Sequence, residues 1–122
     1  MSPQRILIIE DDADVRETLG DALRGAGLAV DLAVDGIDGL ERLRAGPAPS
    51  LILLDLRMPR LCGAEFLRAL RADEAHAHLP VITMTAGSDP AGGDGVAAHL
   101  HKPFDLHDLL QIVLSVTGAS AA

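Results

Sequence analysis

The 122-residue chain has few aromatic residues, few cysteines and no long apolar run. Phe66 and Phe104 are its only aromatic (Phe, Trp or Tyr) residues, so the core must be built from Leu, Ile, Val and Ala. The single cysteine, Cys62, excludes an internal disulfide and a zinc ribbon, and it favours a reducing, cytoplasmic compartment. No run approaches the ~18 apolar residues of a membrane span, and we expect no secretory leader before the first apolar run.

Positive charge is also scarce. Ten Lys and Arg residues stand against 18 Asp and Glu, which gives a net charge of −8. This balance argues against direct nucleic-acid binding and against docking on an anionic membrane. Lys102 is the only lysine. Since 48% of the residues are hydrophobic, the chain is long and apolar enough for one domain with a packed core.

The chain does contain alternating strand and helix patterns. Apolar runs typical of buried parallel strands, two of them weaker, occupy 5–9, 28–34, 51–54, 80–84 and 99–101. Helical periodicity and capping residues predict helices over 12–26, 35–45, 63–72 and 106–116. This order predicts an α/β fold, a doubly wound parallel sheet of five strands with helices on both faces.

The apolar positions of these helices indicate which faces are buried. We expect the first, third and last helices to bury one apolar stripe each. In the first helix the stripe is Val15, Leu19, Ala22 and Ala26, and in the third it is Phe66, Leu67 and Leu70. In the last helix it is Leu106, Leu109, Leu110, Val113 and Leu114. Asp35 and Asp105 are the expected N-caps of the second and last helices.

The segment between the predicted fourth and fifth strands has too few residues for a full helix. Only twelve residues, 87–98, separate the predicted fourth and fifth strands, and four glycines and Pro90 stand among them. A full helix with two loops does not fit this length. Each interior Gly costs about 1 kcal/mol in a helix and each Pro about 3 kcal/mol. We therefore expect the helix between these strands to be shortened or absent.

Polar residues gather where the predicted strands end. The residues at these four strand ends are Glu10, Asp11, Asp12, Asp55, Thr85 and Lys102. Each of them alone is more often a cap or a solvated turn, but ligand sites in open parallel sheets lie outside the carboxyl ends of the strands. Neighbouring carboxylates repel unless a cation neutralises them, and oxygen ligands favour Mg²⁺, with Mn²⁺ as the alternative. With a hydroxyl and an ammonium nearby, the set predicts a phosphoryl site with Asp55 as nucleophile.

The same residues lie in segments that resemble the receiver domains of bacterial two-component response regulators, the CheY-like family. The matching segments are Ile6–Asp12, Leu53–Pro59 with Gly63 after it, Pro80–Ala86 and Lys102–Phe104. The resemblance covers about residues 4–116 and implies a flavodoxin-like sheet of order 2-1-3-4-5. It implies a single receiver domain over 1–122, in which 117–122 form a frayed tail that is either a cut linker or a genuine terminus.

The resemblance implies roles at the phosphoryl site. Asp55 is the expected phosphoacceptor, Thr85 and Lys102 the expected phosphoryl-binding residues, and the Lys102–Pro103 bond is expected to be cis. In the family the threonine moves toward the phosphoryl group, and an aromatic residue three positions before the lysine follows it. That position is His99 here, so Thr85 and His99 form the expected switch, unless His99 is a half-exposed strand residue that never moves.

The resemblance also implies a metal site. Asp11 is expected to ligate Mg²⁺ directly, together with Asp55, and Glu10 to act on the metal through water. The backbone carbonyl of Arg57 is expected to complete the protein ligands. The side chain of Arg57 and the position of Gly87 are where the family tunes dephosphorylation, and Gly87 offers no side chain to position a water.

The implied function is a phosphorylation-dependent signalling switch. Its donor is a histidine kinase or a histidine phosphotransfer protein, and its output is an unidentified downstream protein or a fused output domain. The chain is then a phosphoacceptor rather than an enzyme, catalysing only its own phosphorylation and slow autodephosphorylation. Since the family dimerises through the helix that is short here, we expect a monomer or weak dimer.

Three other functions compete with this one. A Mg²⁺-dependent phosphohydrolase typically has a second Asp two residues after its nucleophile, where Arg57 stands here. A flavin or nucleotide binder needs a phosphate-binding loop after the first strand, where three acids stand instead. A non-phosphorylated scaffold stays open as an alternative function because of the short helix.

Two weaker candidates lie elsewhere in the chain. His76 and His78 could bind a metal as an H-x-H pair, but a solvated loop is the preferred interpretation. Cys62 is interpreted as incidental.

Overall fold

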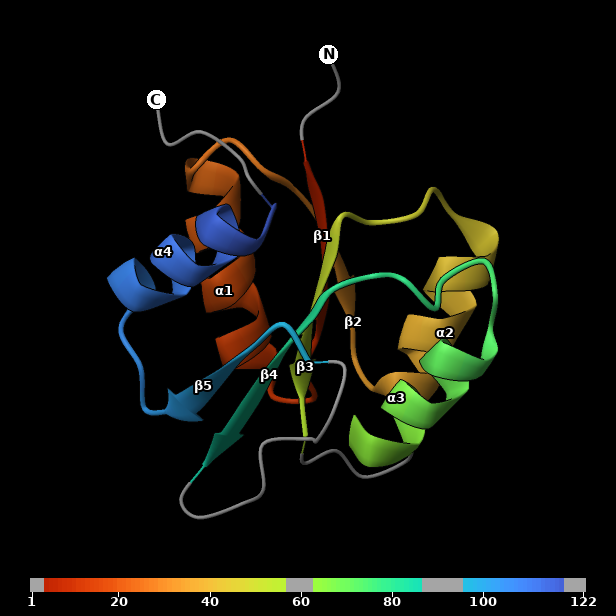
Figure 1. Ribbon diagram of the computed structural model, residues 1–122. Coiled ribbons are helices and arrows are strands. Elements are labelled where there is room, and N and C mark those ends of the chain that lie inside the picture. The colour runs from red at the N-terminus through yellow and green to blue at the C-terminus, as the bar shows by residue number, and fades with distance from the viewer. Residues whose placement is uncertain (1–3, 57–62, 87–95, 118–122) are drawn as a thin grey trace.

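The computed structural model describes residues 4–56, 63–86 and 96–117 (Figure 1). Its strands are β1 (Arg5–Ile9), β2 (Ala29–Ala33), β3 (Leu51–Asp55), β4 (Val81–Ala86) and β5 (Ala98–Lys102). The helices of the described part are α1 (Ala13–Gly25), α2 (Gly36–Ala45), α3 (Gly63–Ala72) and α4 (Leu106–Thr117). The predicted alternation of strand and helix is therefore confirmed.

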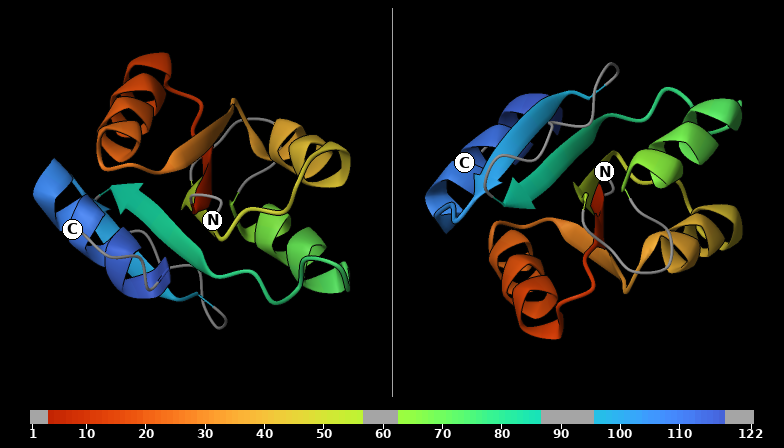
Figure 2. Two further views of the ribbon diagram at one scale, coloured as in Figure 1. Left: turned by 90° about the horizontal axis from the view of Figure 1, so that it is seen from above. Right: turned by 90° about the horizontal axis from the view of Figure 1, so that it is seen from below.

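All five strands form one parallel sheet in the order β2-β1-β3-β4-β5, as predicted. Helices α1 and α4 cover one face of this sheet, and α2 and α3 cover the other (Figures 1 and 2). Because parallel strands all run the same way, their carboxyl ends meet at one edge. None of the described helices is long and apolar enough to cross a membrane.

Each face of the sheet has its own core. On β1, Ile6 and Ile8 pack toward α1 and α4, whereas Leu7 and Ile9 pack toward α2 and α3. This alternation is the period of two that every strand imposes on its side chains. Phe66 is fully buried in the second core, with the expected Leu67 and Leu70 of α3 beside it. The apolar runs of the sequence are therefore strands buried on both faces.

The helix faces differ from the prediction at two positions. Ala26 was expected in the buried stripe of α1 but is exposed, and Leu23, which is fully buried, takes its place. The reason is that α1 ends at Gly25, so Ala26 is the C-cap and its N–H donates to the Leu23 carbonyl. Leu106 was expected inside but is 40% exposed, because it opens the first turn of α4, at the rim of the core.

The fourth and fifth strands are longer than their apolar runs. The ladder between β4 and β5 continues to the pair Ala86 and Lys102, so Thr85 and Lys102 lie within strands rather than after them. Polar residues at these positions end the apolar pattern but not the backbone pairing. The short helix expected between these strands falls on 87–95, which lie outside the described residues. Val96 and Ala97, which lead into β5, are not helical.

Candidate functional site

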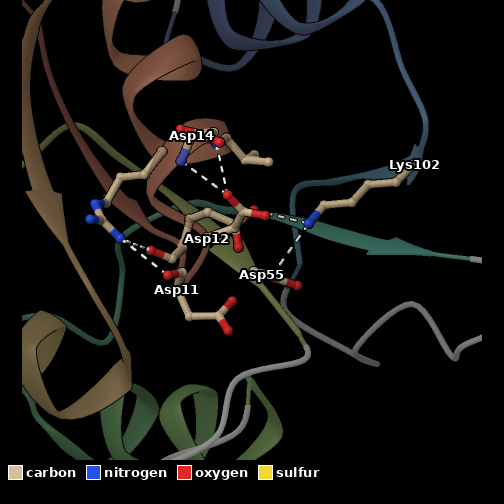
Figure 3. A network of polar contacts seen from close by, with 8 residues as sticks. Asp11, Asp12, Asp14, Asp55 and Lys102 are labelled. Atoms are coloured by element: carbon tan, nitrogen blue, oxygen red, sulfur yellow. Dashed lines mark hydrogen bonds and ion pairs between the residues drawn. The ribbon is translucent and has the colours of Figure 1, made fainter.

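Three strand ends meet at Lys102, the last residue of β5 (Figure 3). Its Nζ donates to Glu10 Oε1 at 2.9 Å and to Asp55 Oδ2 at 3.4 Å. Glu10 directly follows β1, and Asp55 is the last residue of β3. The order of the sheet thus brings together residues that are 92 and 47 positions apart in the chain.

The carboxylates beside Lys102 form a cluster that could hold a cation. One oxygen each from Glu10, Asp11 and Asp55 lie within 4.8 Å of one another. Glu10 and Asp55 are buried, whereas Asp11 is exposed. Glu10 Oε2 is buried and has no hydrogen-bond partner among the described residues. An all-oxygen set with one unsatisfied buried carboxylate oxygen fits a hard cation such as Mg²⁺.

The charges of this cluster shift the pKa of Glu10 and that of Lys102. Burial first, and then the Asp55 carboxyl, raise the pKa of Glu10 to about 8, although the Lys102 ammonium acts to lower it. Burial alone would lower the pKa of Lys102, but Glu10 and Asp55 outweigh it and the pKa is raised. Without a cation, the site therefore holds a protonated lysine and a carboxyl that keeps its proton near neutral pH.

Thr85 adds a hydroxyl at the same edge of the sheet. It comes one residue after Met84, the cross-strand partner of Asp55. Its side chain is 1% exposed, and its Oγ1 has no hydrogen-bond partner among the described residues. A buried hydroxyl without a partner costs free energy, so it is suited to donate to a group that enters the site.

The third acid of the predicted triplet has a different role. Asp12 is the N-cap of α1, and its Oδ1 accepts from the backbone N–H groups of Asp14 at 3.0 Å and Val15 at 3.2 Å. The carboxylate of Asp12 is thus turned to the first turn of the helix, and Asp12 does not belong to the cluster of Glu10, Asp11 and Asp55. A helix N-terminus leaves backbone N–H groups unpaired, and an aspartate here satisfies two of them.

Arg16 is a site residue that the sequence analysis missed. Its guanidinium donates to the backbone carbonyl of Glu10 at 2.8 Å and lies 3.4 Å from that of Asp11. It thereby holds the loop that carries Glu10 and Asp11, two of the three clustered acids. The only indication in the sequence is a basic residue in the first turns of a helix that follows an acidic loop.

The predicted switch residues are not joined in this structure. His99 Nδ1 lies 2.6 Å from the hydroxyl oxygen of Thr83, its direct cross-strand partner, whereas the cross-strand partner of Thr85 is His101. The switch pair of Thr85 and His99 stays a prediction. Arg57, the expected carbonyl ligand, lies outside the described residues, as do Gly87 and Cys62. The expected cis bond between Lys102 and Pro103 is confirmed.

The H-x-H pair of His76 and His78 lies after α3, in the segment that leads to β4. His76 Nδ1 lies 3.0 Å from Asp73 Oδ2, within hydrogen-bond distance, and His78 is exposed. The interaction with His76 lowers the pKa of Asp73. Among the described residues, the one group of three or more ligating side chains is that of Glu10, Asp11 and Asp55.

Comparison with known proteins gives a consistent result. The family model of the response regulator receiver domain matches residues 6–114. Response regulator MprA of Mycobacterium sp. (strain KMS) is 42% identical over 113 residues, which are 88% of this chain and 48% of that protein. The chain thus spans about half the length of the curated relatives that it matches.

Solved structures agree with the family model. A response regulator from Chloroflexus aurantiacus has a TM-score of 0.88 at 28% identity, over 97% of this chain and all of that chain. Vibrio cholerae chemotaxis protein CheY4 has a TM-score of 0.87 at 27% identity, over 94% of this chain and 99% of that chain. The chain therefore belongs to the response regulator receiver domains of two-component systems, whose general function is to accept a phosphoryl group.

Proposed function

We propose that Asp55 of this chain accepts a phosphoryl group from a histidine kinase or a histidine phosphotransfer protein in the presence of Mg²⁺. The observation that carries the proposal is the ammonium group of Lys102, which contacts both Glu10 and Asp55 at a cluster of three carboxylates. A nucleophilic carboxylate, a cluster able to hold a cation and a protonated lysine are the parts that phosphoryl transfer to an acid requires.

The chemistry follows from these positions. An Asp55 carboxylate oxygen attacks the phosphorus of a phosphohistidine, the O–P bond forms, the N–P bond breaks, and the imidazole leaves. Lys102 Nζ, 3.4 Å from Asp55 Oδ2, and the Thr85 hydroxyl, which no described residue contacts by a hydrogen bond, stabilise the negative charge of the phosphoryl oxygens. Mg²⁺, when held by Glu10, Asp11 and Asp55, supplies the positive charge that lets several carboxylates and a phosphoryl group share one site.

A pocket beside this site is the proposed docking place of the phosphodonor protein. It measures about 500 Å³ and is lined by residues of α1 and of the stretch from the last residue of β5 to the first residue of α4. Those residues are Asp14, Val15, Thr18, Leu19, Lys102, Pro103, Phe104 and Leu106. Lys102 belongs to both the pocket and the acidic cluster, so a donor seated in this largely apolar pocket can present its phosphohistidine to Asp55.

Signalling beyond the phosphoryl site is part of the same proposal. Since the curated relatives are about twice as long as their match to this chain, the output is a fused domain or a separate downstream protein. The chain is proposed to act as one receiver domain over 1–122, as a monomer or weak dimer in the cytoplasm. Its own chemistry is proposed to be limited to its phosphorylation and slow autodephosphorylation.

Intact mass after incubation with Mg²⁺ and acetyl phosphate tests this function. The expected result is a gain of one phosphoryl group, which is lost in Asp55→Asn and on chelation of Mg²⁺. Asp21→Asn is a matched control, because Asp21 lies on α1 in an exposed ion pair with Arg24. If neither acetyl phosphate nor a phosphorylated histidine phosphotransfer protein modifies the wild-type chain, the non-phosphorylated scaffold becomes the better interpretation.

A further inference from the structure

The edge strand β5 carries a second pair of histidines, His99 and His101, on one face. Residues two apart on a strand point to the same side. The residues between and before them, Leu100 and Ala98, pack against the core under α1 and α4, so the histidines face the other way. Their ring centroids are 4.6 Å apart and their planes are perpendicular, at 89°. The strand thus holds two imidazoles next to each other.

His99 is oriented as metal-binding histidines usually are. Its Nδ1 is paired with the hydroxyl of Thr83 at 2.6 Å, which fixes the ring and leaves Nε2 as the remaining nitrogen. Nε2 is buried and has no hydrogen-bond partner among the described residues. Burial, and secondarily His101, lowers the pKa of His99, so its ring is neutral at neutral pH and keeps a lone pair.

The spacing of the two rings fits chelation of a single ion. An imidazole nitrogen lies about 2.0–2.1 Å from a bound transition metal, which places each ring centroid roughly 3.2 Å from the ion. Two centroids 4.6 Å apart would subtend roughly 90° at an ion held by both rings. That angle is the one between neighbouring ligands in the tetragonal and octahedral geometries of Ni²⁺ and Cu²⁺. Because the rings now meet edge to face, the exposed ring of His101 has to turn to point a nitrogen at an ion on His99.

We propose that His99 and His101 chelate a divalent transition-metal ion of the Ni²⁺ and Cu²⁺ class, with water completing its coordination. Thr83 acts as the outer partner that orients His99. Imidazole nitrogens prefer such ions, whereas the carboxylates of Glu10, Asp11 and Asp55 prefer Mg²⁺. The chain then has two metal sites of different chemistry, one at the end of β1 and β3 and one on β5. This site does not depend on phosphorylation.

Calorimetric titration with Ni²⁺ tests the site directly. The chain is used without a polyhistidine tag, in a Cys62→Ser background, with excess Mg²⁺ to occupy the carboxylates. We expect one Ni²⁺ per chain, binding at least about tenfold more weakly in His101→Gln and in His99→Gln, and about tenfold more weakly in Thr83→Val. His101 is exposed, so His101→Gln is the deciding variant because it leaves the core intact.

Matched controls separate this site from other histidines and from the phosphoryl site. The double variant His76→Gln/His78→Gln removes the other H-x-H pair, and we expect it to bind Ni²⁺ as wild type does. Asp55→Asn is expected to bind Ni²⁺ unchanged even though it cannot be phosphorylated, so the two proposals fail independently. The broadening of amide NMR signals by paramagnetic Ni²⁺ should be centred on 98–102. Unchanged affinity in His101→Gln, or broadening centred on 73–78, overturns the proposal.

Discussion

At the scale of single residues, Glu10 shows how burial changes the chemistry of an acid. Its pKa is raised from the ordinary 4.5 to about 8, first by burial and then by the Asp55 carboxyl. A carboxyl held this way is neutral where an exposed glutamate is charged. It can give up its proton when a cation arrives, because the cation replaces the proton and binds Oε2, which has no hydrogen-bond partner in the described part of the chain.

The raised pKa of Glu10 predicts how stability depends on pH in the absence of metal. The folded state binds this proton more tightly than the unfolded state, so the stabilisation is complete below 4.5 and is lost as pH rises toward about 8. We expect the melting temperature in EDTA to fall across that window. Circular dichroism melts of wild type and Glu10→Gln check this, since the amide does not titrate and should flatten the slope. Parallel slopes in the two proteins contradict the assignment to Glu10.

At the scale of elements, the loop from β1 to α1 divides its acids between chemistry and folding. Asp12 accepts two backbone N–H groups of α1, whereas Asp11 has a carboxylate oxygen within the cation-binding cluster. Both are exposed acids in adjacent positions. Only the capping geometry separates them, since an N-cap residue turns its side chain back over the first helical turn.

This division predicts opposite effects of neighbouring substitutions. Asp12→Ala should lower the free energy of unfolding by about 1 kcal/mol, because two N–H groups of α1 lose their acceptor. It should still be phosphorylated. Asp11→Asn should keep its stability and lose Mg²⁺-dependent phosphorylation. Urea unfolding and intact mass after acetyl phosphate measure the two effects.

Asp12→Asn is the matched control for the cap, because asparagine removes the charge but still accepts from the helix N-terminus. We expect its stability to stay close to that of wild type. A loss of phosphorylation in Asp12→Asn comparable to that in Asp11→Asn would contradict the assignment of Asp12 to the cap alone.

At the scale of the whole molecule, the sheet and its strand-end site could be predicted, but several side-chain contacts could not. Apolar runs of strand length identify strands buried on both faces, and parallel strands must end at one edge. The burial of Glu10, in contrast, depends on how closely Lys102 and Asp55 pack over it, and the sequence shows only that the three follow strands. The pairing of His99 with Thr83 depends on the register between β4 and β5, which no local pattern specifies.

The pocket between α1 and the start of α4 carries the last prediction. A phosphodonor protein must approach Asp55 from a surface that Lys102 also borders, and the pocket meets this condition. Leu106, which lines it, is 40% exposed. Leu106→Asp should therefore weaken phosphotransfer from a phosphorylated histidine phosphotransfer protein, because a buried charge in an apolar contact is costly. Acetyl phosphate is small and does not need the pocket, so its reaction should be unchanged.

Val34→Asp is the matched control, because Val34 is an apolar residue with 45% exposure that does not line the pocket. Stopped reactions separated by gel can compare the initial rates of both variants with each donor. A loss confined to Leu106→Asp and to the protein donor indicates docking over the pocket. An equal loss with acetyl phosphate would indicate that Leu106→Asp damages the site itself, and an equal loss in Val34→Asp would place the donor on a different surface. The two donors thus separate recognition from chemistry, which share Lys102 but not Leu106.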